Sequence, residues 1–198
     1  MIKLPPHGAH QRIGLFGGSF NPAHQGHRQV AIYALKRLQL DWIWWLVSPQ
    51  NPLKSRNETA DYTKRLVETK RLAKHPRFIV SNIEQQIATT YTAQTIKALK
   101  TFSKAKFVWI MGADSFASIH RWHDWVGIVE CVNLAVLARP GYSIKALDGK
   151  AAIRFRNKRL AKAQPSALAG RSAPQWVFIS MPLRKESSSA IRARRKTI

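Results

Sequence analysis

The sequence has a single cysteine and no long apolar run, and each scarcity excludes a class of protein. Cys131 alone cannot form an internal disulfide, and so low a cysteine content suits a reducing cytoplasm. No stretch approaches the roughly 20 apolar residues of a membrane span, and the N-terminus lacks the apolar run of a signal peptide. We therefore expect a soluble, cytoplasmic protein without a membrane partner.

Acidic residues are also scarce. The 198 residues include 10 Asp and Glu against 33 Lys and Arg, a formal net charge of +23. Residues 141–198 contribute 14 basic and only 2 acidic side chains. Such an excess fits nucleic acid, highly anionic small substrates or a solvated basic surface. The basic residues are scattered, and no helix-turn-helix, zinc-finger or RNP pattern is present, which argues against nucleic acid as the partner.

The apolar pattern alternates between short strands and helices along the chain. The predicted strands are Ile13–Phe16, Trp42–Val47, Phe78–Ser81, Phe107–Met111, Leu134–Leu137 and Trp176–Ile179, and the predicted helices are Gly26–Leu38, Asp61–Lys74, Ala93–Phe102, Ser115–His120 and Trp125–Val129. This alternation predicts a doubly wound α/β fold, a Rossmann-like and mostly parallel sheet with helices on both faces.

The length and the hydrophobic content predict a single domain over residues 1–198, because 45% hydrophobic residues suffice for a sizeable core. We expect residues 1–11 to form a flexible N-terminal segment. Residues 141–175 lack clear periodicity and are predicted to be a basic connecting segment, with one helix at Ala151–Ala163 and a loop at Gln164–Pro174.

The glycine-rich stretch after the first predicted strand lacks two familiar phosphate signatures. It contains neither G-x-x-x-x-G-K-[ST] nor G-x-G-x-x-G, which excludes a P-loop and the dinucleotide fingerprint of hydride-transfer enzymes. Instead Gly17 and Gly18 lead to His24 and His27, which open a helical pattern. A strand, a glycine turn and a helix N-terminus form an anion site, because backbone N–H groups and the helix dipole converge there. The alternatives are helix capping or half of a metal site, although zinc lacks further ligands nearby.

Further motifs follow other predicted strands, and each allows a functional and a structural interpretation. Ser48–Lys54 is a proline-punctuated loop that ends in a cation, or an ordinary turn. Asp114 can accept hydrogen bonds from ribose hydroxyls or cap a helix. Trp122 offers a flat face to a heteroaromatic ring or lies in the core. Ser187–Arg192 forms a second phosphate-binding helix start or a frayed polar tail.

The stretch Gly17–His27 resembles the G-G-x-F-x-P-x-H-x-G-H signature of the nucleotidyltransferase superfamily, whose members transfer AMP or CMP onto phosphate groups. The chain is similar to one family within it, the bacterial nicotinate-nucleotide adenylyltransferases. The segments that carry this resemblance are Gly17–His27, Ser48–Lys54, Thr90–Thr95, Gly112–Phe116 with Trp122, Arg139–Gly141 and Ser187–Arg192. Two positions depart from the family pattern: Asn21 stands where many members have Asp, and Leu53 where His is frequent.

The resemblance implies a reaction of ATP with nicotinate mononucleotide that gives nicotinate adenine dinucleotide and pyrophosphate, a step of NAD biosynthesis. It implies that His24 and His27 are catalytic and contact the ATP phosphates. The other implied roles are phosphate binding by Gly17, Gly18, Ser19, Phe20, Lys54, Ser187, Ser189 and Arg192, ribose binding by Asp114, and nicotinate binding by Tyr91, Thr92, Ala93, Trp122 and His123.

The expected partners are therefore ATP and nicotinate mononucleotide, and a homo-oligomer is compatible with the sequence. Mg²⁺ is expected as the Mg-ATP complex, held mainly by phosphates and water without a protein metal site. The alternatives are a sister adenylyltransferase that uses nicotinamide mononucleotide or phosphopantetheine, and a nucleic-acid-binding protein that uses the basic C-terminal third.

Overall fold

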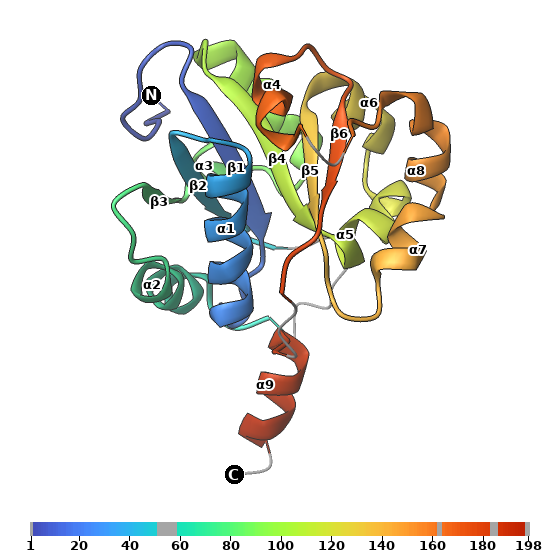
Figure 1. The fold of residues 1–198 in the computed structure, drawn as a ribbon. Helices are drawn as coiled ribbons and strands as arrows, with labels where there is room; N and C mark the ends of the chain where they lie inside the picture. Colours follow the sequence, from blue (N-terminus) through green and yellow to red (C-terminus); the bar gives the residue numbers. More distant parts are fainter. Residues whose placement is uncertain (1, 51–58, 162–163, 183–185, 197–198) are drawn as a thin grey trace.

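A computed structural model of the protein describes residues 2–50, 59–161, 164–182 and 186–196. Its centre is a six-stranded parallel sheet in the order β3-β2-β1-β4-β5-β6 (Figure 1). The strands are β1 (Arg12–Gly18), β2 (Trp42–Val47), β3 (Phe78–Ser81), β4 (Lys106–Gly112), β5 (Asn133–Leu137) and β6 (Trp176–Ile179). All predicted strands are confirmed.

The strands form here because their sequences are apolar on both faces. β2 is buried from Ile43 to Val47, and every residue of β5 is buried. A parallel strand that is covered on both faces needs such a continuous apolar run, whereas a strand with one face in water alternates. The sheet is therefore the middle layer of three.

Helices cover both faces of the sheet, which confirms the doubly wound α/β prediction. One buried cluster, around Trp44 and Trp109, lies between the sheet and the helices α4, α5, α6 and α8. The other, around Trp45 and Leu35, lies between the sheet and α1. The helices are α1 (Gln25–Arg37), α2 (Tyr62–Leu72), α3 (Ile83–Gln86), α4 (Thr92–Phe102), α5 (Ala113–Ser118), α6 (Trp125–Cys131), α7 (Ser143–Leu147), α8 (Lys150–Arg154) and α9 (Ser188–Lys196), with 3₁₀ turns at η2 (Ile119–Arg121), η3 (Arg156–Lys158) and η4 (Pro165–Gly170).

The strand order fixes where a ligand can enter. The chain begins in the middle of the sheet, runs outward through β2 to β3, returns to β4 beside β1, and continues outward to β6. The helices that follow β1 and β4, α1 and α5, pack on opposite faces of the sheet. The two connections therefore diverge at the carboxyl ends of these neighbouring strands and leave a crevice there.

The segment 141–175 contains more regular structure than the sequence predicts. The helix expected at Ala151–Ala163 is wrong in extent, because α8 ends at Arg154. The carbonyl of Phe155 accepts a hydrogen bond from the Trp176 indole (2.9 Å), and the Leu160 N–H donates to the Trp176 carbonyl (2.8 Å). After Phe155 the chain forms only the short 3₁₀ turn η3 and then bonds to β6 through Leu160, so the helix does not continue. The expected loop at Gln164–Pro174 contains η4.

The segment before β1 contacts the body of the protein. Ile2 and Leu4 pack against the buried cluster around Trp44. His7 is hydrogen-bonded through Nε2 to the Ser103 hydroxyl (2.7 Å). The flexibility expected of residues 1–11 stays a prediction. Among the described residues, no helix combines the length and apolar character that crossing a bilayer requires.

Asn133 is expected to hold the 164–175 segment against β5. The buried Asn133 amide donates to the carbonyls of Leu168 and Arg171 (2.8 Å each), and its Oδ1 accepts from the Gln175 N–H (2.9 Å). Asn133→Ala removes the Asn133 partner of the Arg171 carbonyl and of the Gln175 N–H, while the Leu168 carbonyl still accepts from the Arg171 N–H (3.2 Å), so we expect a loss of about 2–4 kcal/mol in the free energy of unfolding. Urea titration followed by circular dichroism measures it, with the exposed Asn157→Ala as control. A loss no larger than that of the control contradicts this role.

Candidate functional site

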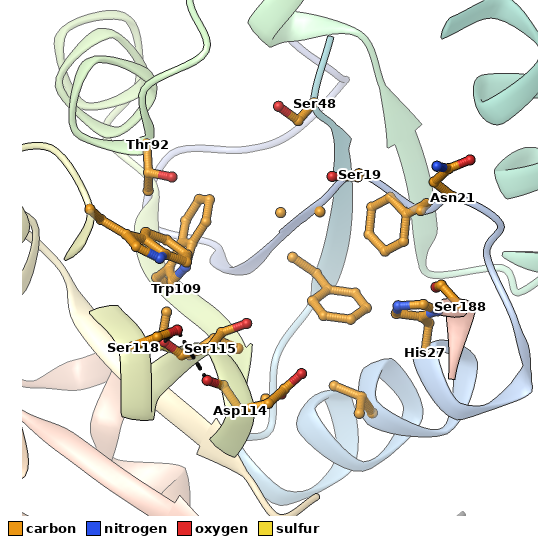
Figure 2. A pocket seen from close by; sticks show the side chains of 18 of the residues that line it. Ser19, Asn21, His27, Ser48, Thr92, Trp109, Asp114, Ser115, Ser118 and Ser188 are labelled. Carbon is orange, nitrogen blue, oxygen red and sulfur yellow. Dashed lines mark hydrogen bonds between the residues drawn. The ribbon is translucent and has the colours of Figure 1, made fainter. Parts of the chain in front are cut away.

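A cavity of about 800 Å³ lies at the carboxyl ends of β1 and β4. Its wall combines the β1–α1 loop, the start of α4, the α5 region and the serines before and within α9 (Figure 2). The lining residues include Gly17, Gly18, Ser19, Phe20, Asn21, His27, Ser48, Glu84, Tyr91, Thr92, Trp109, Asp114, Arg121, Trp122, His123, Arg139, Ser187, Ser188 and Ser189. The structure thus brings most of the predicted site residues to one cavity.

Gly17, at the end of β1, is favoured by packing as well as by the predicted anion site. A Cβ on Gly17 would stand 2.5 Å from Cη2 of Trp109, whose ring lies against the glycine and lines the cavity. Phe20 follows with a φ of 44°, a left-handed conformation that is costly for an aromatic residue. Its ring is buried and packs edge-on against Phe16 and His27, at centroid distances of 5.4 and 5.2 Å. The turn is therefore fixed by aromatic packing.

His27 lines the cavity from the first turn of α1. Its Nδ1 accepts a hydrogen bond from the backbone N–H of His24 (3.2 Å). Because Nδ1 accepts, the proton of the neutral imidazole resides on Nε2. His27 can therefore present an N–H donor to a ligand at the N-terminal end of this helix.

His24 lies behind the cavity wall. Its side chain is 5% exposed, it is the N-cap of α1, and it does not line the cavity. Burial, and next the positive charge of Arg139, lower its pKa to about 4, so the ring is neutral near pH 7. The structure therefore separates the two predicted catalytic histidines into one that faces the cavity and one that packs beneath it, with ring centroids 3.9 Å apart.

The segment Ser187–Arg192 is hydrogen-bonded to the β1–α1 loop. The Ser188 hydroxyl donates to the Pro22 carbonyl (2.9 Å), and Nη1 of Arg192 donates to the Asn21 carbonyl (2.7 Å). Glu186 accepts from the Gly26 N–H (3.1 Å), so a carboxylate lies at the N-terminus of α1. Ser187 and Ser189 line the cavity, whereas Arg192 bonds to the β1–α1 loop and does not line the cavity. The predicted Lys54 and the departure at Leu53 lie outside the described residues.

The predicted nicotinate end lies across the cavity from His27. Tyr91, Thr92, Trp122 and His123 line it, and the Tyr91 and His123 rings are 4.6 Å apart. α4 starts here with Tyr91 as its N-cap, and the Gln94 N–H donates to the Tyr91 carbonyl (3.0 Å). The N–H groups of Thr92 and Ala93 have no acceptor among the described residues, so they are available to a ligand. Ala93 is buried and does not line the cavity.

Asp114 has a basic neighbour that the sequence analysis did not assign. It lies in the first turn of α5, and its Oδ1 is 3.6 Å from Nε of Arg139, which follows β5. Arg139 also approaches the start of α1, with Nη1 3.4 Å from where a Cβ on Gly26 would stand. Its place two residues after the predicted strand Leu134–Leu137, at the start of the segment Arg139–Gly141, was the available signal. Arg121, which also lines the cavity, carried no comparable signal.

Glu84 is a second residue that the sequence analysis missed. It is 4% exposed, lines the cavity, and accepts a hydrogen bond from the Thr95 hydroxyl (3.2 Å). Burial raises its pKa to about 7. A lone glutamate on a four-residue helix has no sequence pattern that distinguishes it from a surface residue.

Comparisons with known proteins identify the family and the fold of the chain. A family model described as cytidylyltransferase-like matches residues 15–194. A protein of Ruegeria sp. (strain TM1040) named "probable nicotinate-nucleotide adenylyltransferase" is 46% identical over 92% of this chain and 96% of its own. One of the same name from Caulobacter sp. (strain K31) is 47% identical, over 92% and 97%. The fold is similar to that of the Plasmodium falciparum nicotinic acid mononucleotide adenylyltransferase complexed with NaAD, with a TM-score of 0.72 at 17% identity over 93% of this chain and 83% of that one.

We predict that Glu84 makes the stability of the protein fall with rising pH. Its folded-state pKa of about 7 lies above its ordinary value of 4.5, so the folded state holds the proton more tightly and loses this advantage as the pH rises through that interval. Glu84→Gln carries no titrating proton. We compare the free energy of unfolding of Glu84→Gln minus that of wild type at the two pH values. This difference should be about 2–3 kcal/mol more positive at pH 8 than at pH 4.5. Urea titrations at both pH values measure this, with the exposed Glu130→Gln as control; a difference that does not change with pH contradicts it.

Proposed function

Since the chain belongs to the cytidylyltransferase-like family, we propose that it is a nicotinate-nucleotide adenylyltransferase, which transfers the AMP group of ATP to nicotinate mononucleotide. The observation that carries the proposal is the shared cavity. Hydrogen-bond donors suited to phosphate groups line this cavity, and so does an aromatic, donor-rich region suited to a charged ring. A single cysteine suits the cytoplasm, where we place the enzyme.

The reaction needs no general base. A phosphate oxygen of the mononucleotide is ionised at neutral pH and attacks the α-phosphorus of ATP. The new P–O bond forms as the bond to the β-phosphate oxygen breaks, and pyrophosphate leaves with that electron pair. Catalysis then consists of holding two polyanions in line and stabilising charge on the transferred group. A site rich in donors and poor in carboxylates is suited to this task.

The phosphate end of the cavity is assigned to the β1–α1 loop and the late serines. We assign Nε2–H of His27 to the transferred phosphate, and the hydroxyls of Ser187 and Ser189 to the phosphates of ATP. His24 packs neutral beneath His27 and acts through its position. Mg²⁺ keeps several waters and is held largely by substrate phosphates, so we assign it to the ATP complex that enters as substrate.

The acceptor end is assigned to the α4 start and its neighbours. The Trp122 indole offers a face to the nicotinate ring, and the first N–H groups of α4 suit its carboxylate because the positive end of the helix dipole lies there. Asp114, oriented by Arg139, is assigned to a ribose.

His27→Ala should lower kcat about a hundred- to a thousandfold, because a donor aimed at transition-state charge contributes about 3–4 kcal/mol. Pyrophosphate release from ATP and nicotinate mononucleotide measures it, and thermal unfolding shows whether the variant is folded. The matched control is His75→Ala, at a histidine that does not line the cavity. Wild-type turnover in a folded His27→Ala protein would disprove the assignment.

Nicotinate mononucleotide should be preferred over the amide, nicotinamide mononucleotide, by about tenfold or more. The amide presents donors to the N–H donors of α4 and loses hydrogen bonds worth roughly 1–3 kcal/mol. The kcat/KM values for these two acceptors and for phosphopantetheine, measured in parallel, decide between this function and its sister reactions. Trp122→Ala should weaken both pyridine acceptors alike, because the indole stacks on either ring. Equal efficiency on acid and amide would refute the acceptor assignment.

A further inference from the structure

Arg65 is a buried guanidinium that the assignments above leave unused. It lies on α2, its side chain is 1% exposed, and among the described residues it forms no ion pair with a carboxylate. Its donors instead bond to four backbone carbonyls: Ser19 (2.7 Å), Ser48 (2.8 Å), Pro49 (2.7 Å) and Ala60 (2.9 Å). A buried charge costs several kcal/mol, and a well-packed apolar residue would often be at least as stable. Stability alone is therefore a poor explanation of this residue.

The bonds of Arg65 join two loops that line the cavity. Ser19 belongs to the loop after β1 and Ser48 to the loop after the neighbouring β2, and both line the cavity. The Ser48 N–H also donates to the Gly18 carbonyl (3.0 Å), so the loops already touch. The planar guanidinium, with its fixed donor directions, adds an angular constraint that a single backbone bond does not supply.

The bond to Ser19 determines how the next peptide N–H is directed. In a trans peptide the C=O and the following N–H point in opposite directions. A Ser19 carbonyl held by Arg65 therefore turns the Phe20 N–H away from Arg65, and Arg65 itself does not line the cavity. Phe20 has its left-handed φ of 44°, and backbone N–H groups around such a residue form anion-binding concavities.

We propose that Arg65 is a positioning residue that sets the Phe20 N–H, through the Ser19 carbonyl, for the phosphate transferred in the cavity. The inference rests on the proposed adenylyl transfer. Arg65 does not touch the substrate; it fixes the peptide that does. Its positive charge lies behind the same loop and adds to the attraction of the polyanionic ligands.

The first test is Arg65→Lys, which keeps the charge and loses the planar array of donors. We expect kcat to fall about ten- to a hundredfold while the KM for ATP changes less than threefold, because a misplaced donor costs more in the transition state than in the ground state. Arg65→Ala should lose more, and millimolar guanidinium should restore part of its kcat. The matched control is Arg77→Lys, whose guanidinium also donates to a backbone carbonyl, that of Leu40 (3.3 Å), without lining the cavity.

The second test does not require turnover. In ¹⁵N-labelled wild type and Arg77→Lys, the Phe20 amide resonance should shift when α,β-methylene-ATP, which cannot transfer its AMP group, is added, and in Arg65→Lys the shift should be much smaller. A folded Arg65→Lys with wild-type kcat, or with the same Phe20 shift as wild type, overturns the positioning role. Absence of turnover with every acceptor in wild type instead refutes the proposed function, and the Phe20 shifts then still decide the role of Arg65.

Discussion

The fold depends on the position of β1, which pairs in parallel with β2 on one side and with β4 on the other. Because β1 starts the chain in the middle of the sheet, every later strand must be added outward from it, first in one direction and then in the other. The connections after β1 and β4 leave toward opposite faces, and their separation opens the cavity. The burial of apolar strands on both faces and the location of the site are thus consequences of the same pairing.

The charges around the cavity follow a consistent arrangement. Three cationic or donor-rich features lie at or behind the part of the cavity formed by the β1–α1 loop. They are the start of α1 with His27, Arg139 after β5, and Arg65 beneath the loops. One carboxylate, that of Glu186, lies at the start of α1, where it accepts from the Gly26 N–H, and burial favours the protonated form of Glu84 in the cavity wall. The net charge of +23 therefore has a local counterpart in the site and is not only a property of the surface.

The sequence was sufficient to predict the strands, most helices and the majority of the cavity wall. Gly17–His27 could be located because its spacing places backbone donors and His27 at one helix start, a local feature. Arg139 could not be assigned a role, because its contact with Asp114 joins segments that follow two different strands. Glu84 could not be assigned one, because its burial is a tertiary property that its sequence neighbours do not indicate. His24 shows a different limit, since spacing along a helix does not say which of two histidines faces outward.

The burial of Arg65 could not be predicted from the sequence either. In sequence it belongs to a run rich in charged residues, Thr-Lys-Arg-Leu-Val-Glu-Thr-Lys-Arg, which is typical of a solvated helix face, yet it is the most buried cation described. The prediction of α2 as a helix is confirmed, but the direction of that helix relative to the two loops is a tertiary property. Residues that act by holding other backbone segments are therefore the hardest to identify from a single sequence.

The hydrogen bonds between the late serine segment and the β1–α1 loop have a consequence for folding. Ser188 bonds to the carbonyl of Pro22, and Arg192 to that of Asn21, across separations of 166 and 171 residues. Contacts between segments so distant in sequence form readily only after the sheet has brought the segments together, because the entropy of loop closure has then already been paid. The cavity wall that contains Ser187–Ser189 is therefore completed after the sheet, as a late step of folding.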